Sequence, residues 1–172
     1  MSEEKLSGAA TEIMQSAIAR TRAYFDSEYG INVAEIESHV GDTASLTLLD
    51  MTAIIGLGGQ INLLVAFSFQ ESLVNSMYAK MNAGFDVPEN EVDMYREATV
   101  GEVVNTILGH CTIDLQKLDN QGIPMTPPVI IDHIKTIRRM KNTIFFTQSL
   151  DTPLGQINIS LIGSKELFNS AL

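Results

Sequence analysis

Residues Gly59-Gln60-Ile61-Asn62 recur 96 positions later as Gly155-Gln156-Ile157-Asn158. Two further matches keep the same order along the chain, at spacings of 94 and 90: Leu73-Val74-Asn75-Ser76 with Leu167-Phe168-Asn169-Ser170, and Glu12–Ile18 with Glu102–Leu108. Three ordered matches at nearly constant spacing predict a duplicated unit of roughly 95 residues. Two copies are too few for a solenoid, so we expect both halves to share one sheet.

The predicted fold is a single α+β domain over residues 1–172, with a first repeat of about 1–85 and a second of about 90–172. Each half has apolar residues at helical spacing, then alternating strands, then a second helical segment. We expect a pseudo-twofold duplicated unit, in which a mostly antiparallel sheet packs against long paired helices. The expected helices are about 4–26, 70–82 and 91–118, with a short one at the C-terminus; the expected strands lie within 33–49 and 60–69 and near 123–131, 133–139, 142–149 and 156–163. The glycines Gly56, Gly58 and Gly59 are interpreted as a hairpin turn, because they match no phosphate-binding loop.

Composition excludes several classes of protein. The 172 residues carry 21 acidic and 11 basic side chains, a formal net charge of -10. Such a chain is a poor candidate for general binding to nucleic acid or anionic membranes. The one dense basic stretch, Lys135 to Lys141, holds four of the eleven bases, and it is interpreted as a solvated hairpin.

Metal, disulfide and targeting signals are weak. The single cysteine, Cys111, cannot form an internal disulfide, and His39, His110 and His133 show no metal-binding spacing. The chain begins with the acidic Ser2-Glu3-Glu4 and has no apolar run of membrane-spanning length. A soluble, cytoplasmic protein without a metal site is expected.

The long helix expected over about 91–118 has two unlike faces. Its apolar stripe, expected to face the core, is Val100, Val103, Val104, Ile107 and Cys111. Its opposite strip is Ala98, Glu102, Asn105 and Gly109, with Gly101 beside it. Glu102 and Asn105 are three positions apart and therefore project together. Glycine inside a helix costs up to about 1 kcal/mol relative to alanine, so a strip of small residues around two polar side chains favours a docking surface.

The spacing of Glu102 and Asn105 is not specific by itself. Residue frequencies predict roughly 0.7 Glu-x-x-Asn matches by chance, and a second one, Glu166 to Asn169, is interpreted as such noise. Pro128, however, follows Asn105 after 22 intervening residues. Requiring proline at that position lowers the chance expectation to roughly 0.02.

This pattern resembles the active-site helix of the CheX, CheC and FliY family of chemotaxis phosphatases, whose signature is [D/S]xxxExxN, 22 residues and then proline. That family is also built on a pseudo-twofold repeat with two long helices. Ala98 stands at the Asp or Ser position, which is typical of a CheX-like branch. The first repeat has Glu12, Gln15 and Ser38 at the corresponding positions, which indicates one active centre and a degenerate first copy.

The resemblance implies hydrolysis of the aspartyl phosphate on a CheY-like response regulator. Asn105 would orient the attacking water, Glu102 would pair with a lysine of the regulator, and Pro128 would be structural. Ala98, Gly101 and Gly109 would form the docking surface. The chain would need no cofactor of its own, because Mg²⁺ is expected in the regulator, and it would form a homodimer.

Two other functions are compatible with the same residues. One is a non-catalytic module that docks on a response regulator or a flagellar component. The other, less favoured, is a small-molecule sensor with a cavity inside the sheet.

Overall fold

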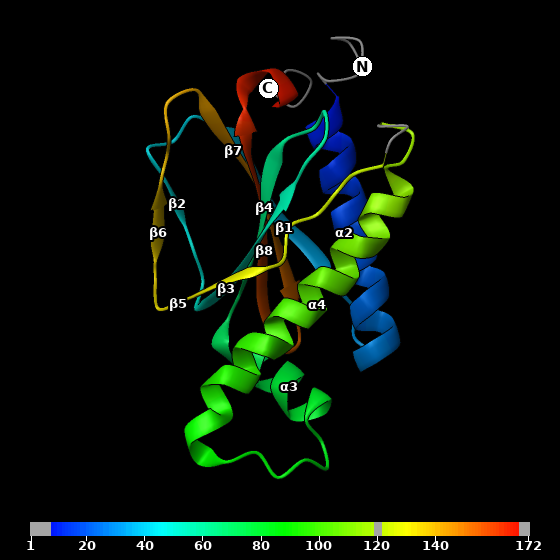
Figure 1. Ribbon diagram of the computed structural model, residues 1–172, viewed down its shortest axis with the longest axis vertical. Helices are drawn as coiled ribbons and strands as arrows, with labels where there is room; N and C mark the ends of the chain where they lie inside the picture. The colour runs from blue at the N-terminus through cyan, green and yellow to red at the C-terminus, as the bar shows by residue number, and fades with distance from the viewer. Residues whose placement is uncertain (1–7, 119–121, 169–172) are drawn as a thin grey trace.

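The computed structural model describes residues 8–118 and 122–168. They form an α+β domain in which an antiparallel sheet packs against helices, as predicted (Figure 1). The helical elements are α2 (Ala9–Tyr29), α3 (Glu71–Met81), η1 (Glu89–Glu91), α4 (Val92–Asp114) and η2 (Lys165–Phe168). The strands are β1 (Ala34–Gly41), β2 (Ser45–Thr47), β3 (Met51–Leu57), β4 (Leu63–Phe69), β5 (Val129–Asp132), β6 (Thr136–Arg138), β7 (Thr143–Thr152) and β8 (Gly155–Ser164).

The six-stranded sheet has the order β1-β7-β8-β4-β3-β5, and every neighbouring pair is antiparallel. Exchanging β1, β3 and β4 with β5, β7 and β8 gives the same order read backwards. The remaining strands, β2 and β6, pair with each other, so they also exchange without changing the topology. This order is the one expected when two copies of a helix–strand unit share a sheet. The repeat boundaries near residues 85 and 90 stay a prediction.

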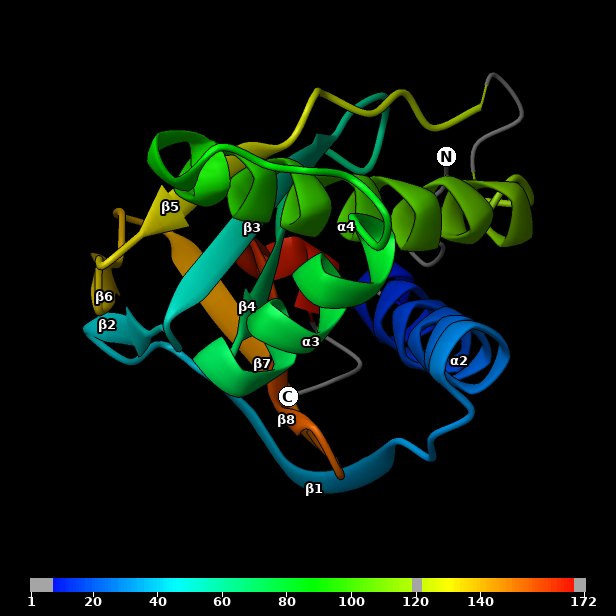
Figure 2. The ribbon, with the colours of Figure 1, turned by 90° about the horizontal axis from the view of Figure 1, so that it is seen from below.

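The two faces of the sheet are covered differently. Alternate residues of β4 and β8, such as Phe67 and Ile159, join the main core with α2, α3 and α4. The opposite face meets the β2–β6 ribbon through a smaller cluster that includes Leu46 and Phe145. Figure 2 shows α4 and α2 away from the β2–β6 ribbon, with the strands of the large sheet between them and α3 in front of the strands. The inner side of α4 therefore packs on the sheet and the other helices, and its outer side faces away from the core.

The structure corrects the interpretation of the glycine cluster. Met51–Leu57, to which the sequence analysis assigns no strand, is the central strand β3, and Gly56 lies inside it rather than in a turn. The segment reads as a nearly continuous apolar run because it is buried on both faces, so it lacks the alternation of a half-buried strand. The turn begins after Leu57, and Gly59 adopts a φ of 70° there.

The two segments of the first sequence match also differ in secondary structure. Gly59–Asn62 lies in the turn between β3 and β4, whereas Gly155–Asn158 lies within β8. The β7–β8 hairpin is longer than the β3–β4 hairpin, because its paired residues continue to Thr152 and Gly155. Ser2-Glu3-Glu4, the start of the first expected helix, Asn169 and Ser170 lie outside the described residues.

Candidate functional site

Helix α4 positions the predicted site. All five residues of the predicted apolar stripe are buried in the main core: Val100, Val103, Val104, Ile107 and Cys111. Burial raises the pKa of the Cys111 thiol to about 11, so this cysteine is an inert core residue at neutral pH. With this stripe anchored, the opposite side of α4 faces outward.

Glu102 and Asn105 lie together on this outer side, and both are exposed. Within residues 8–118 and 122–168, neither side chain has a hydrogen bond or ion pair to another residue. A carboxylate and an amide three positions apart on a helix are neighbours. The pair can therefore offer one negative charge and one donor–acceptor group to an outside molecule.

An open groove of about 350 Å³ runs beside this pair. It is lined by Gly101, Glu102 and Asn105 on α4 and by the segment Met125–Pro128 opposite. We call it the α4 groove. The segment that forms its second wall follows α4 in the chain and returns along the helix toward β5 (Figure 1).

Gly101 is buried rather than exposed, although it lines the α4 groove, and its role in docking stays a prediction. A Cβ at Gly101 would lie 3.4 Å from Pro128 Cγ and 3.7 Å from Ile130 Cδ1. Its small size thus serves an internal contact, because it lets Pro128 and the start of β5 rest on the helix. Pro128 directly precedes β5 and closes the groove next to the polar pair.

The second wall is fixed to β3 by hydrogen bonds. The Gly56 N–H donates to Thr126 Oγ1 at 2.8 Å, and the Thr126 N–H donates to the Gly56 carbonyl at 3.0 Å. Two residues after Gly56, the Gly58 N–H donates to the Pro124 carbonyl at 2.8 Å. The segment therefore extends the pairing of β5 with β3 and has a defined position.

The glycines of β3 permit this close approach. A Cβ at Gly56 would lie 3.0 Å from Thr126 Cγ2, and one at Gly58 would lie 3.1 Å from Pro124 Cγ. Both distances are shorter than ordinary carbon–carbon contacts. Thr126 cannot be recognised from the sequence, because its partner Gly56 lies 70 positions away and no local pattern joins them.

The rest of the outer strip of α4 is small or apolar. Ala98 is exposed and Gly109 is partly exposed, and nothing lies within 4 Å of a Cβ built at Gly109. Met94 and Ile113, at the two ends of the strip, are 58% and 59% exposed. Exposed apolar side chains around a polar pair are typical of a protein-binding surface.

The corresponding residues of the first repeat lie in a different environment. Glu12 on α2 forms an ion pair with Lys117, with 2.9 Å between Oε2 and Nζ. Arg20 on α2 binds the Asp114 carboxylate through both Nε and Nη2, and Ser16 Oγ donates to the same carboxylate. The hydrogen bond from Arg20 lowers the pKa of Asp114 to about 2. Glu12 and Arg20 are therefore tied to the end of α4 and to the residues that follow it, whereas Gln15 is exposed.

The described residues contain no group of three or more His, Cys, Asp or Glu side chains that could hold a metal ion. Nor does the described part of the chain contain a helix that is both long enough and apolar enough to cross a membrane.

Comparison with known proteins identifies the family. The family model "Chemotaxis phosphatase CheX" matches residues 51–150. This match covers more than half of the chain, and the chain therefore belongs to the CheX family. No curated protein sequence matches it significantly.

Solved structures share the fold over most of the chain. A chemotaxis protein CheX from Desulfovibrio desulfuricans is 19% identical, with a TM-score of 0.72 over 87% of this chain and 97% of that one. The chain also resembles one in the CheX–CheY–BeF₃–Mg²⁺ complex from Borrelia burgdorferi, with 18% identity and a TM-score of 0.63 over 90% and 96% of the two chains. At these identities the likeness establishes the fold.

Proposed function

We propose that this chain hydrolyses the aspartyl phosphate of a CheY-like response regulator, with the regulator docked on the outer side of α4. The observation that carries the proposal is the exposed, internally unpaired pair of Glu102 and Asn105 beside the α4 groove. Membership of a phosphatase family supports the same activity. The CheX–CheY complex to which a structural neighbour belongs supports a regulator as the partner.

Asn105 is assigned the catalytic role. Phosphoryl transfer depends on positioning and charge stabilisation more than on covalent chemistry. The Asn105 amide can accept a hydrogen bond from a water molecule and donate one to a phosphoryl oxygen. It would thereby hold that water in line with the phosphorus–oxygen bond that breaks. The phosphoryl group transfers from the aspartate oxygen to the water oxygen. The bond between phosphorus and the aspartate oxygen breaks, and the products are the aspartate carboxylate and inorganic phosphate, which keeps the protons of the water.

Glu102 is assigned a docking role. Its carboxylate projects next to Asn105 and has no basic partner among the described residues. A lysine beside the regulator's phosphoaspartate would provide that partner, and the resulting ion pair would fix the position of the amide. Mg²⁺ would enter with the regulator, where it neutralises phosphoryl charge. The chain itself would act in the cytoplasm, where such regulators are phosphorylated.

Homodimerisation is proposed on the family resemblance. Strand β1 is an edge of the sheet, and its residues from Ala34 to His39 are all exposed. An uncovered edge strand presents backbone groups that a second copy can pair with. Light scattering after size exclusion measures the mass directly, and a monomer at all concentrations would contradict the dimer.

The deciding experiment measures phosphate release from phosphorylated candidate regulators in single turnover, with and without the protein. We expect a faster release with the cognate regulator, and no acceleration with the Asn105→Ala variant at equal binding. If the wild-type protein binds a regulator tightly and leaves the release rate unchanged, the non-catalytic docking module is correct instead.

A further inference from the structure

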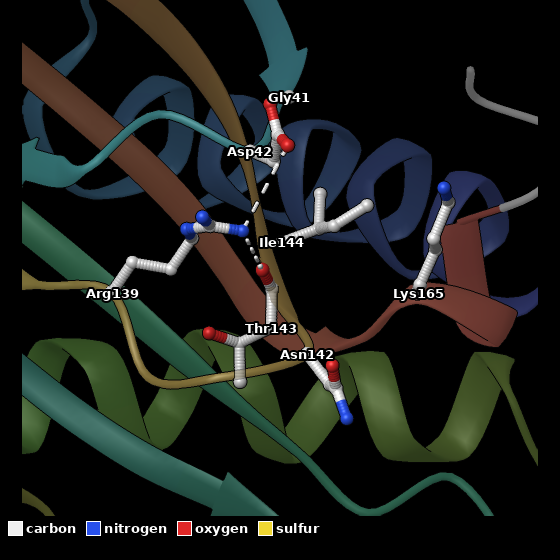
Figure 3. Close-up of a pocket in the computed structure, with 7 residues that line it drawn as sticks. All are labelled: Gly41, Asp42, Arg139, Asn142, Thr143, Ile144 and Lys165. Atoms are coloured by element: carbon white, nitrogen blue, oxygen red, sulfur yellow. Dashed lines mark hydrogen bonds and ion pairs between the residues drawn. The ribbon is translucent and has the colours of Figure 1, made fainter.

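A second groove, unrelated to α4, lies where β1 ends and β7 begins. It is lined by Gly41 and Asp42, by Arg139 and Asn142–Ile144, and by Lys165, and it measures about 350 Å³ (Figure 3). We call it the basic groove. It shares no lining residue with the α4 groove. Its three segments are far apart in the sequence, so only the fold brings them together.

The backbone around the basic groove is held in place. The Arg139 N–H donates to the Ala44 carbonyl at 2.9 Å. The turn that follows is closed on Met140, whose carbonyl accepts from Thr143 N at 3.2 Å and from Thr143 Oγ1 at 2.7 Å. Gly41 pairs with Phe145 in the sheet. The side chains of the groove therefore project from ordered positions, as preformed ligand sites require.

The Arg139 side chain has unused hydrogen-bond donors. Its side chain is 32% exposed, and its internal contacts use Nη1 alone: 3.5 Å to the Thr143 carbonyl and 3.9 Å to Asp42 Oδ2. Both distances are at the outer limit for such contacts. Among the described residues, Nε and Nη2 have no acceptor. Because Asp42 is 83% exposed, its pairing with Arg139 is weak and a bound anion can displace it.

Lys165 supplies a second cation. Its ammonium group has no ion pair within the described residues. Figure 3 shows Lys165 and Arg139 on opposite sides of Ile144, with the Asn142 side chain below them. The groove thus combines two cations with one carboxylate, that of Asp42, and with one amide, one hydroxyl and one apolar side chain.

Basic residues are concentrated around the basic groove. Four of the chain's eleven bases, Arg138, Arg139, Lys141 and Lys165, lie in the segments that form or adjoin the groove, although the whole chain has a net charge of -10. The same segments hold two acids, Asp42 and Glu166, so bases outnumber acids there, which favours an anion relative to the rest of this acidic protein.

We propose that the basic groove binds the phosphate group of a small soluble molecule. The Arg139 guanidinium, with its planar fork of donors, suits two oxygens of a phosphate, and Lys165 provides a point charge for a third. A volume near the lower end of ligand pockets fits a pyrophosphate or a nucleoside diphosphate better than a large cofactor. The proposal does not depend on the function assigned to α4.

The test is a nuclear magnetic resonance titration of the ¹⁵N-labelled full chain with ADP, with pyrophosphate and with adenosine. We expect the amide signals of Gly41, Asn142 and Thr143 to shift with the first two ligands and not with adenosine. Arg139→Gln and Lys165→Gln should each raise the Kd about tenfold. Lys141→Gln is the matched control, because it removes the same charge from the same turn without lining the groove, and it should change the Kd less than about twofold.

Each outcome is decisive. Equal affinity for ADP and pyrophosphate supports the proposal and identifies the phosphate chain as the ligand, whereas tighter binding of ADP supports it and identifies a nucleotide. Absence of shifts up to roughly 10 mM ligand, equal shifts with adenosine, or an equal loss in Lys141→Gln overturns it. Thermal unfolding midpoints within about 2 °C of wild type confirm that the variants remain folded.

Discussion

Helix α2 carries Glu12 and Gln15 at the positions that correspond to Glu102 and Asn105 on α4. On α2 the carboxylate is paired with Lys117, and the nearby Arg20 is bound to Asp114. On α4 the carboxylate and amide have no partner among the described residues, and a groove lies next to them. The two copies of the pattern thus differ in their carboxylates and in the adjoining groove: Glu12 is paired and Glu102 is not, although Gln15 and Asn105 are both exposed.

The wall beside the pair also distinguishes the two helices. Pro128 and Thr126 form that wall for α4. In the first repeat the position of Pro128 is taken by Ser38, which is an exposed residue within β1. A motif on a helix therefore makes a site only when the segment that packs beside it completes the groove.

The largest expected effect comes from removing the amide. Asn105→Ala should lower the single-turnover rate of regulator dephosphorylation by about 100-fold or more, because the water loses its positioning group. The matched variant Gln15→Ala on α2 should change that rate less than about twofold. A large loss in Gln15→Ala would show that the first repeat is also catalytic and would end the contrast between the helices.

Glu102→Ala should weaken docking more than chemistry. We expect KM for the phosphorylated regulator to rise about tenfold and kcat to fall less, since a rim ion pair contributes mainly to association. The rise should shrink at high salt. Glu97→Ala, which removes an exposed carboxylate from another side of α4, is the control. If both variants raise KM equally, Glu102 has no specific partner.

Thr126→Val should loosen the wall of the α4 groove. The Gly56 N–H loses its acceptor, which costs about 0.5–1.5 kcal/mol of unfolding free energy, and the displaced wall should raise KM several-fold. Thr126→Ser keeps the oxygen and should restore KM. Chemical denaturation and steady-state kinetics measure the two effects, and a KM unchanged in Thr126→Val would mean that the wall does not contact the partner.

A smaller effect is expected from the ion pair that joins α2 to α4. The pKa of Asp114 in the folded protein is about 2, below its ordinary value of 3.8, because of Arg20. A lowered pKa stabilises the fold above the ordinary pKa, and this contribution is lost as the pH falls from about 4 to 2. Since the pair is one-third exposed, its contribution should stay below about 1 kcal/mol.

Denaturation from pH 2 to 6 checks this. The difference in unfolding free energy between wild type and Asp114→Asn should be largest above pH 5 and narrow toward pH 2. Asp86→Asn, at an exposed carboxylate after α3, should show no such trend. A difference that stays constant with pH would contradict the role given to the ion pair.

The fold class and the outward face of α4 follow from the amino-acid sequence alone. The apolar stripe at helical spacing fixes which side of α4 is buried, so Glu102 and Asn105 had to project on the other. The ordered repeats indicated a shared sheet, and the motif with its distant proline indicated the family. These inferences rest on local periodicity and spacing, both of which a single sequence contains.

Other features of the fold and of the site depend on how the elements pack in three dimensions. Strand β3 is buried on both faces and so carries no alternation, and Gly101 is covered by Pro128 rather than exposed. The bond between Thr126 and Gly56, the ion pair of α2 with Lys117 and the basic groove all join residues that are distant in the chain. Such contacts depend on how the sheet and helices pack, because side-chain partners across a fold leave no pattern along one sequence.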